Sequence, residues 1–279
     1  MNELFVRIRF LLPSLPRAEK AIAEALLEHP EAITDMTLAQ LSEESSTSEA
    51  SIVRFSKRLG FSGYTEMKNA FINAVAEGGK PEEEEIGTSD NMKTILQKVY
   101  QSNVQTLSDT LVLAENEYDD ALAALLKAKS IHFFGTGDAY AVCLLACMKF
   151  KRLGIPCSAE GDVMLQLLTA SNLTAGDVAV AISYEGRSKN VVEAMRIAKK
   201  VNATTISITK RSKSPLLKYT DIPLFIAVTD LSIGRDKITR RVSDQFIIDA
   251  LYLGYATNTR RDYKQQLKRS QIAIDANKL

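Results

Sequence analysis

The stretch IHFFGTGDAYAVCLLACMKF, residues 131–150, decides the fold class of the larger part of this chain. Its first four residues, Ile131–Phe134, are mostly apolar and predict a short buried strand. The glycines that follow allow a sharp turn, and the apolar run behind them predicts a helix over residues 139–153. A strand that passes through a glycine turn into a helix is the first half of a βαβ unit.

Strand-like and helix-like segments continue to alternate after this stretch. The predicted strands cover residues 131–134, 156–159, 178–183, 204–209 and 223–228. The predicted helices between them cover residues 139–153, 162–170 and 188–201. This alternation predicts an α/β domain with helices on both faces of a parallel sheet. Two earlier helices, predicted near 92–113 and 118–126, would either bridge domains or build a dimer interface.

The N-terminal part contains only helix-like patterns. The predicted helices cover residues 4–12, 17–28, 38–44, 49–59 and 64–75. Thr37 and Ser48 are suited to cap the third and fourth of them, and Gly60 to end the fourth. Because only the polar turn Ser45–Thr47 separates these two helices, the pattern predicts a helix-turn-helix unit.

The second helix of this unit carries polar and basic residues on one face. We predict that four residues lie near base edges: Ser48, Glu49, Ser51 and Arg54. Lys57 and Arg58 are predicted to lie nearer to the phosphates of double-stranded DNA. The same pattern also fits a small helical bundle with an ordinary solvated face, and the pattern alone leaves both interpretations open.

Length and charge set the domain organisation. At 279 residues the chain has room for two domains of ordinary size. Glycines, a proline and a run of glutamates predict a linker at 78–91. This places the helix-turn-helix domain at 1–77 and the α/β domain, with its preceding helices, at 92–279. The formal net charge of +1 gives no sign of nucleic acid binding, so a DNA-binding surface must come from local clustering.

No stretch is apolar enough to predict a membrane span or a signal peptide, and we expect a cytoplasmic protein. The three cysteines are an odd number without the spacing of a metal site. Cys143 and Cys147 lie in an apolar helical run, so we interpret them as buried structural thiols. We therefore expect no metal and no cofactor.

Two loops at the ends of predicted strands carry the residue types of a ligand site. In open α/β sheets, ligands bind at the carboxyl ends of the strands. Glycines let the backbone turn sharply, and the helix that follows offers free amide donors and a partial positive charge. The hydroxyls of Thr136, Ser183 and Ser188 could add donors to an anion or a polyol. The predicted ligand-binding residues are Gly135, Thr136 and Gly137 in the first loop, and Ser183, Glu185, Gly186 and Ser188 in the second.

Residues 48–64, SEASIVRFSKRLGFSGY, closely resemble the DNA-binding segment of the RpiR family of bacterial regulators. Residues from about 120 to 260 resemble the SIS (sugar isomerase) domain that these regulators carry. Ser214–Leu216 and Ser243–Tyr252 resemble later signatures of the same family. The resemblance implies an all-α helix-turn-helix domain followed by a SIS-type α/β/α sandwich with a parallel sheet.

The resemblance also implies a function. A regulator of this kind, expected here to be a repressor of carbohydrate metabolism genes, binds a double-stranded DNA operator. A sugar phosphate or related sugar derivative bound to the SIS domain changes the affinity for the operator. The resemblance further implies a homodimer or homotetramer, and a dimer suits a reader of two half-sites.

The chain departs from the family pattern at two positions of the predicted ligand site. Ala139 stands where the first loop usually ends in serine, and Glu185 replaces the second serine of the second loop. A carboxylate repels a phosphate dianion, and hydrogen bonds to charged groups contribute about 1.5–3 kcal/mol. Three explanations remain open: a neutral or amino sugar held by Glu185, a Glu185 turned away to pair with Arg187 or Lys189, or a vestigial site.

A SIS-fold sugar-phosphate isomerase is the alternative to a regulator. Isomerisation needs a general base, and carboxylates and histidines are the usual candidates. From Asp230 onward the chain contains neither glutamate nor histidine, which leaves Glu160, Asp162 and Glu185 near the predicted pocket. We therefore expect a regulator and not an enzyme. A protein-interaction scaffold is a third possibility, in which Arg54 and Arg58 would not matter for binding a partner.

Overall fold

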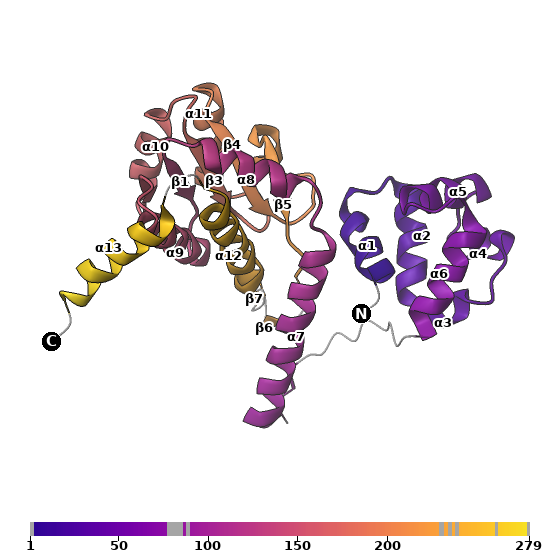
Figure 1. Ribbon diagram of the computed structural model, residues 1–279. Coiled ribbons are helices and arrows are strands. Elements are labelled where there is room, and N and C mark those ends of the chain that lie inside the picture. Colours follow the sequence, from indigo (N-terminus) through magenta and orange to yellow (C-terminus); the bar gives the residue numbers. More distant parts are fainter. Residues whose placement is uncertain are drawn as a thin grey trace. The chain divides into compact units, whose positions relative to one another are not determined.

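The computed structural model describes residues 3–76, 86–87, 90–228, 232–233, 236–237, 240–259 and 262–277 (Figure 1). The chain forms two compact units. The first contains residues 1–113 with two short later segments, and the second contains most of the chain from Ala114 onward. Most of the predicted linker at 78–91 lies outside the described residues.

The first unit is built from helices. They are α1 (Glu3–Leu11), the short 3-10 helix η1 (Leu12–Ser14), α2 (Arg17–Glu28), α3 (Pro30–Ile33), α4 (Leu38–Glu44), α5 (Glu49–Arg58), α6 (Tyr64–Ala76) and α7 (Met92–Val112). A two-stranded antiparallel ribbon, β6 (Ser232–Ile233) with β7 (Asp236–Lys237), is grouped with them. Side chains from α1, α2, α4, α5 and α6 form one apolar core, in which Phe5, Phe55 and Phe71 are fully buried.

Local capping explains where the two central helices begin and end. At the start of α4 the Thr37 hydroxyl accepts a hydrogen bond from the Gln40 amide, and the Thr37 amide donates to the Gln40 side-chain oxygen. The two residues therefore form a capping box. Ser48 accepts a hydrogen bond from the Ser51 amide at the start of α5. Gly60 follows α5 with a φ of +91°, which favours glycine. These predicted boundaries are confirmed.

Helix α7 falls in the first unit, where it contacts α1. The sequence pattern grouped residues 92–113 with the α/β domain instead. Along one side of α7 the residues Thr106, Asp109 and Thr110 are buried, whereas the sequence shows only a run of helical apolar spacing. Contact with α1 is a tertiary feature that this periodicity does not contain.

The second unit is a three-layer sandwich. Its helices are α8 (Glu117–Lys127), α9 (Asp138–Arg152), α10 (Val163–Ser171), α11 (Lys189–Lys200), the 3-10 helix η2 (Leu216–Tyr219), α12 (Arg240–Asn258) and α13 (Tyr263–Asp275). Its strands are β1 (Ile131–Phe134), β2 (Cys157–Ala159), β3 (Val178–Ile182), β4 (Thr204–Thr209) and β5 (Ile222–Phe225). All neighbouring strands are parallel, in the order β2-β1-β3-β4-β5.

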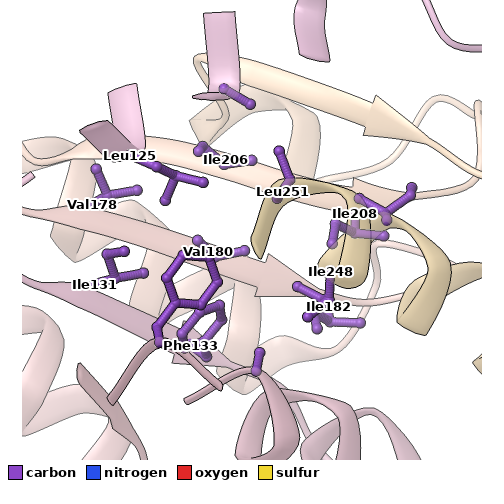
Figure 2. Close-up of a cluster of buried hydrophobic side chains, with 14 of the residues drawn as sticks. Leu125, Ile131, Phe133, Val178, Val180, Ile182, Ile206, Ile208, Ile248 and Leu251 are labelled. Atoms are coloured by element: carbon purple, nitrogen blue, oxygen red, sulfur yellow. The ribbon is translucent and has the colours of Figure 1, made fainter. Parts of the chain in front are cut away.

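Alternate strand residues face opposite layers. Val178, Val180 and Ile182 of β3 join the core covered by α8, α9 and α12, whereas Ala179 and Ala181 join the core covered by α10 and α11. Figure 2 shows Leu125 of α8 and Ile248 and Leu251 of α12 among the side chains of β1, β3 and β4. The predicted α/β/α sandwich with a parallel sheet is confirmed.

The structure also tests the predictions for the cysteines, for His132 and for membrane-spanning helices. Cys143 and Cys147 are buried in the α9 core, as expected, and burial raises the pKa of both thiols. His132 is half-buried in β1, as expected for a strand residue. Among the described residues, none of the helices is both long and apolar enough to span a bilayer.

Candidate effector site and DNA-reading helix

The sheet order brings the two predicted loops together. β1 and β3 are neighbours, and the chain leaves them for helices on opposite faces of the sheet, which makes their carboxyl ends the topological switch point. The first loop follows β1 and the second follows β3. The Thr136 and Ser188 hydroxyls lie 3.1 Å apart and share a hydrogen bond across the two loops.

Each loop contains a glycine that cannot be replaced without strain. A Cβ on Gly135 would lie 2.7 Å from Cys143 Sγ and 3.2 Å from the backbone of Ala139. Gly186 has a φ of +61°, and its Cβ would lie 2.8 Å from the Cβ of Ser214. The backbone therefore folds closely onto neighbouring elements at both positions, which explains why glycine is required there.

Both loops lead directly into helices. Gly137 is the N-cap residue of α9 and Ser188 is the N-cap residue of α11, and neither makes a side-chain capping bond. The hydroxyl of Ser188 is turned instead toward Thr136. First-turn amides of two helices therefore begin at the same edge of the sheet, and their partial positive charges favour an anionic group there.

The departure at Glu185 has a structural explanation. The carboxylate of Glu185 forms an ion pair of 2.7 Å with Lys210, in the loop after β4. Lys210 also lies over the ring of Tyr184, 5.1 Å from its centroid, and its amide donates to the Tyr184 carbonyl. The carboxylate thus has a cationic partner, although this partner is neither Arg187 nor Lys189, which the sequence had suggested.

Three further residues near this site were not predicted as ligand-binding residues, although Ser214 lies in one of the family signatures. Gln166 of α10 is fully buried and donates from Nε2 to the carbonyls of Gly135 and Glu160, both at 2.9 Å. Its signal in the sequence is a single amide within the apolar run Val163–Leu168. The hydroxyl of Ser214, close to Gly186, is buried and has no hydrogen-bond partner among the described residues.

The third missed residue is Arg241, in the first turn of α12. Its guanidinium contacts Asp138 at 3.1 Å and Asp244 at 2.5 Å. Asp244 is fully buried, so its charge is compensated inside the unit. The contact with Asp138 ties α12 to the start of α9, next to the first loop.

His132 belongs to a different polar network. Its Nδ1 lies 2.9 Å from the Ser158 hydroxyl, and its Nε2 lies 2.7 Å from the Ser130 hydroxyl, which donates to Asp177. Burial is the main reason that the pKa of His132 is lowered below its usual value. Both ring nitrogens are engaged within β1 and its neighbours, so we interpret His132 as a structural residue.

On α5, most of the predicted DNA-contacting residues lie at the surface. Ser48, Glu49, Arg54 and Lys57 are exposed, whereas Ile52 and Phe55 on the opposite side are buried. The turn before α5 contains Ser46 with a φ of +49°, a conformation that lets the chain reverse between α4 and α5. The geometry of a reading helix behind a tight turn is therefore present.

Two of the predicted DNA contacts have structural partners instead. Ser51 is only 4% exposed, and its hydroxyl accepts from Arg54 and is bonded to Ser48. Because this hydroxyl is buried and bonded to Arg54, we assign it to orienting Arg54, and its predicted base contact stays a prediction. Arg58 forms an ion pair of 2.5 Å with the buried Glu19 of α2, so its guanidinium is engaged in joining two helices.

Comparisons with known proteins agree with this architecture. Residues 2–78 match the helix-turn-helix domain of the rpiR family, and residues 124–251 match the SIS domain. An HTH-type transcriptional regulator of Caldanaerobacter subterraneus is 34% identical over 100% of this chain and 99% of its own length. The chain belongs to the RpiR family. Its function is that of an HTH-type transcriptional regulator, as the sequence predicted.

Further relatives and solved structures match the whole chain or its SIS part. The regulator HexR of Pseudomonas aeruginosa is 29% identical over 98% of this chain and 96% of its own length. The Vibrio vulnificus NanR protein, solved in complex with ManNAc-6P, has a TM-score of 0.62 and 23% identity, and the match covers 99% of this chain and 100% of that one. The sugar isomerase domain of an RpiR transcription factor from Sphaerobacter thermophilus matches 64% of this chain and 98% of its own, with a TM-score of 0.59 and 19% identity.

Proposed function

We propose that this RpiR-family regulator represses genes of carbohydrate metabolism in the bacterial cytoplasm, binding its operator through α5 as a homo-oligomer. An anionic sugar derivative, most simply a sugar phosphate, binds at the loops after β1 and β3 and changes the affinity for the operator. The observation that carries the effector site is the contact between Thr136 and Ser188, which brings two glycine loops and two helix N-termini to one place.

The charge around Glu185 favours an anionic effector over an amino sugar. A free carboxylate would attract a cationic sugar and repel a phosphate. The ion pair with Lys210 engages one oxygen of this carboxylate and offsets its charge, which weakens its attraction for an ammonium group. The first-turn amides of α9 and α11 remain suited to a phosphate. For comparison, the NanR structure holds ManNAc-6P, a phosphorylated sugar.

For the DNA side, we assign Arg54 and Lys57 of α5 as the cationic contacts, because Arg58, although also exposed, is paired with Glu19. Arg54 is oriented by Ser51 at 2.9 Å, and Ser48 and Glu49 are exposed at the start of the helix. Residues near the N-terminus of a reading helix reach base edges, and basic residues farther along reach phosphates. A single unit covers few base pairs, which supports binding as a dimer to two half-sites.

A regulator accounts for these residues better than an isomerase does. The full-length relatives described above are regulators, and the chain matches them across both domains. Of the carboxylates near the loops, Glu185 is paired with Lys210 and Asp138 with Arg241. A general base must lie within hydrogen-bonding reach of the substrate proton, and both carboxylates are engaged with cations of the protein instead. We therefore propose that the SIS domain senses its ligand without converting it.

The effector class is tested by thermal shift with matched ligands. We would measure the unfolding temperature of the protein with sugar phosphates, the same sugars without phosphate, and amino sugars. At about 100 times the dissociation constant, a bound ligand stabilises by about 2.7 kcal/mol. Stabilisation by phosphorylated sugars only is the expected result. Stabilisation by amino sugars only would contradict the proposal, and so would the absence of any response.

Two variants connect the response to the site. Lys210→Met leaves the Glu185 carboxylate without its cation, so we expect weaker binding of phosphorylated sugars. Glu185→Ser restores a hydroxyl donor at this position and removes a negative charge, so we expect tighter binding. Lys200→Met, on the exposed end of α11, is the control for loss of a lysine and leaves the response unchanged.

A further inference from the structure

The outer face of α9 carries an apolar stripe that the sheet does not cover. Leu144, Leu145 and Met148 are 42%, 41% and 57% exposed, and Ala141 is exposed on the same side. These residues are spaced by three, four and seven positions, which places them on one face of a helix. The opposite face of α9 supplies buried residues to the core. Large exposed apolar side chains in one group indicate an interaction surface.

The order of residues along α9 makes this stripe complementary to itself. When two copies pack antiparallel across a two-fold axis between Leu144 and Leu145, the small Ala141 of each copy meets the large Met148 of the other. Leu144 then meets Leu145 at the centre. A two-fold interface requires this property, because the same surface patch must fit its own copy.

The charges at the two ends of α9 match the same arrangement. Asp138 in the first turn has a carboxylate that is 54% exposed, although it contacts Arg241. Lys151 and Arg152, both exposed, lie in the last turn. In an antiparallel pair, the acidic start of each helix lies beside the basic end of the other. The antiparallel helix dipoles add to this attraction.

Helix α13 adds exposed apolar surface beside the same helix. It packs on the C-terminal end of α9, where Ser270 donates to the Arg152 carbonyl, and none of its side chains is buried (Figure 1). Ile272 and Ile274 of α13 are exposed. A helix of 13 residues is only marginally stable without tertiary contacts, so a second surface against α13 would stabilise it.

From this self-complementarity we infer that a second copy of this chain packs antiparallel on α9, with the two-fold axis between Leu144 and Leu145. The inference deepens the proposed homo-oligomer by assigning its surface. Because α9 begins at the first effector loop, the interface is continuous with the effector site. Arg241 joins α12 to Asp138 in the first turn of α9, so the helix that would pair is also fixed to α12 next to this loop.

The first test measures mass in solution, without DNA or sugar. We expect the full-length protein to be dimeric or larger by analytical ultracentrifugation, and the double variant Leu144→Asp/Leu145→Asp to raise the dimer dissociation constant roughly 100-fold or more. The matched control is Leu168→Asp, an exposed leucine of α10 on the other face of the sheet, which keeps the α9-paired dimer. An unchanged mass of the double variant would overturn the inference, as would a monomeric wild type.

The second test reports the register and does not depend on a destabilising variant. Disulfides form between residues whose Cα atoms lie about 4.4–6.8 Å apart. Under mild oxidation, a mixture of Ala141→Cys and Met148→Cys proteins should cross-link, whereas each variant alone should do so at least about 10-fold less. The wild type, with its native cysteines, measures the background. Equal cross-linking of the single variants would contradict the antiparallel arrangement.

A third measurement separates this interface from the proposed function. If the wild type dimerises through α9 but binds no operator, the proposed function fails and the interface stands. If the double variant binds a half-site but not a full operator, both stand. If the protein binds a full operator but the Ala141→Cys and Met148→Cys mixture does not cross-link, only the interface inference fails.

Discussion

The DNA-reading helix and the effector site use charged residues in opposite ways. On α5, the cationic side chains of Arg54 and Lys57 are exposed on one helix, within a single turn of each other. At the effector site, the charge of Glu185 is compensated by Lys210, 25 residues farther along the chain. A surface that lies on one helix can be read from a short stretch of sequence, whereas a site assembled from separate loops cannot.

The same contrast appears within α5 itself. Arg58 resembles Arg54 in sequence, yet it reaches back across 39 residues to the buried Glu19. This pair joins α5 to α2 and is a structural contact, whereas Arg54 remains available at the surface. The predictions below separate these roles, from the largest expected effect to the smallest.

The largest effect is expected from removing the exposed cations of α5. The double variant Arg54→Ala/Lys57→Ala should weaken binding to a selected operator roughly 100-fold, or about 2.7 kcal/mol, because a base-edge contact and a phosphate contact are lost. Fluorescence anisotropy at one fixed salt concentration measures this. The thermal response to the effector should be unchanged, and retained operator affinity would contradict the assignment of α5.

The next effect concerns the close approach at the first effector loop. Gly135→Ala places a Cβ 2.7 Å from Cys143 Sγ, and such overpacking costs about 1–3 kcal/mol. The control is Gly63→Ala in the DNA-binding unit, where a Cβ would have no neighbour within 4 Å. Calorimetry should show a lower unfolding temperature for the first variant only. Equal unfolding temperatures of the two variants would contradict this prediction, because the loop would then have relaxed around the added methyl group.

A smaller effect is expected at the ion pair between α5 and α2. Arg58→Gln leaves the carboxylate of Glu19 buried without its cation. Because the Arg58 side chain is 47% exposed and solvent screens the pair, we expect a loss of about 1 kcal/mol in the stability of the DNA-binding unit. Chemical denaturation checks this, with Arg58→Lys as the conservative control. Weakened operator binding with unchanged stability would instead favour a phosphate contact.

The smallest effect is a pH dependence from His132. Its pKa lies below the ordinary value of 6.5, mainly because of burial, while Asp177 acts in the opposite direction. The unfolded chain therefore binds a proton more readily, so this contribution to stability is complete above pH 6.5 and is lost as the pH falls toward the folded pKa. The unfolding temperature of His132→Asn should decline less over this window than that of the wild type. An equal decline would assign the dependence to other groups.

Some features follow from local sequence because their causes are local. Thr37 and Ser48 bond to amides three residues away, and β1 and β4 have the bounds that the apolar runs predict. The glycine loops after β1 and β3 are likewise marked by residues that only turns and close approaches favour. Such interactions act within a few residues, so an amino-acid pattern is enough to place them.

The sequence alone therefore determined the helix-turn-helix pattern, the alternating strands and helices, and the two glycine loops at which we propose that the effector binds. The strand order, the pairing of Glu185 with Lys210, the burial of Ser51 and the bond from Gln166 to Gly135 came from tertiary packing. Each of these depends on which distant segment lies beside a residue once the sheet and its helices have assembled. The free energy that selects these neighbours comes from the packing of the whole core, so a short stretch of sequence does not predict them.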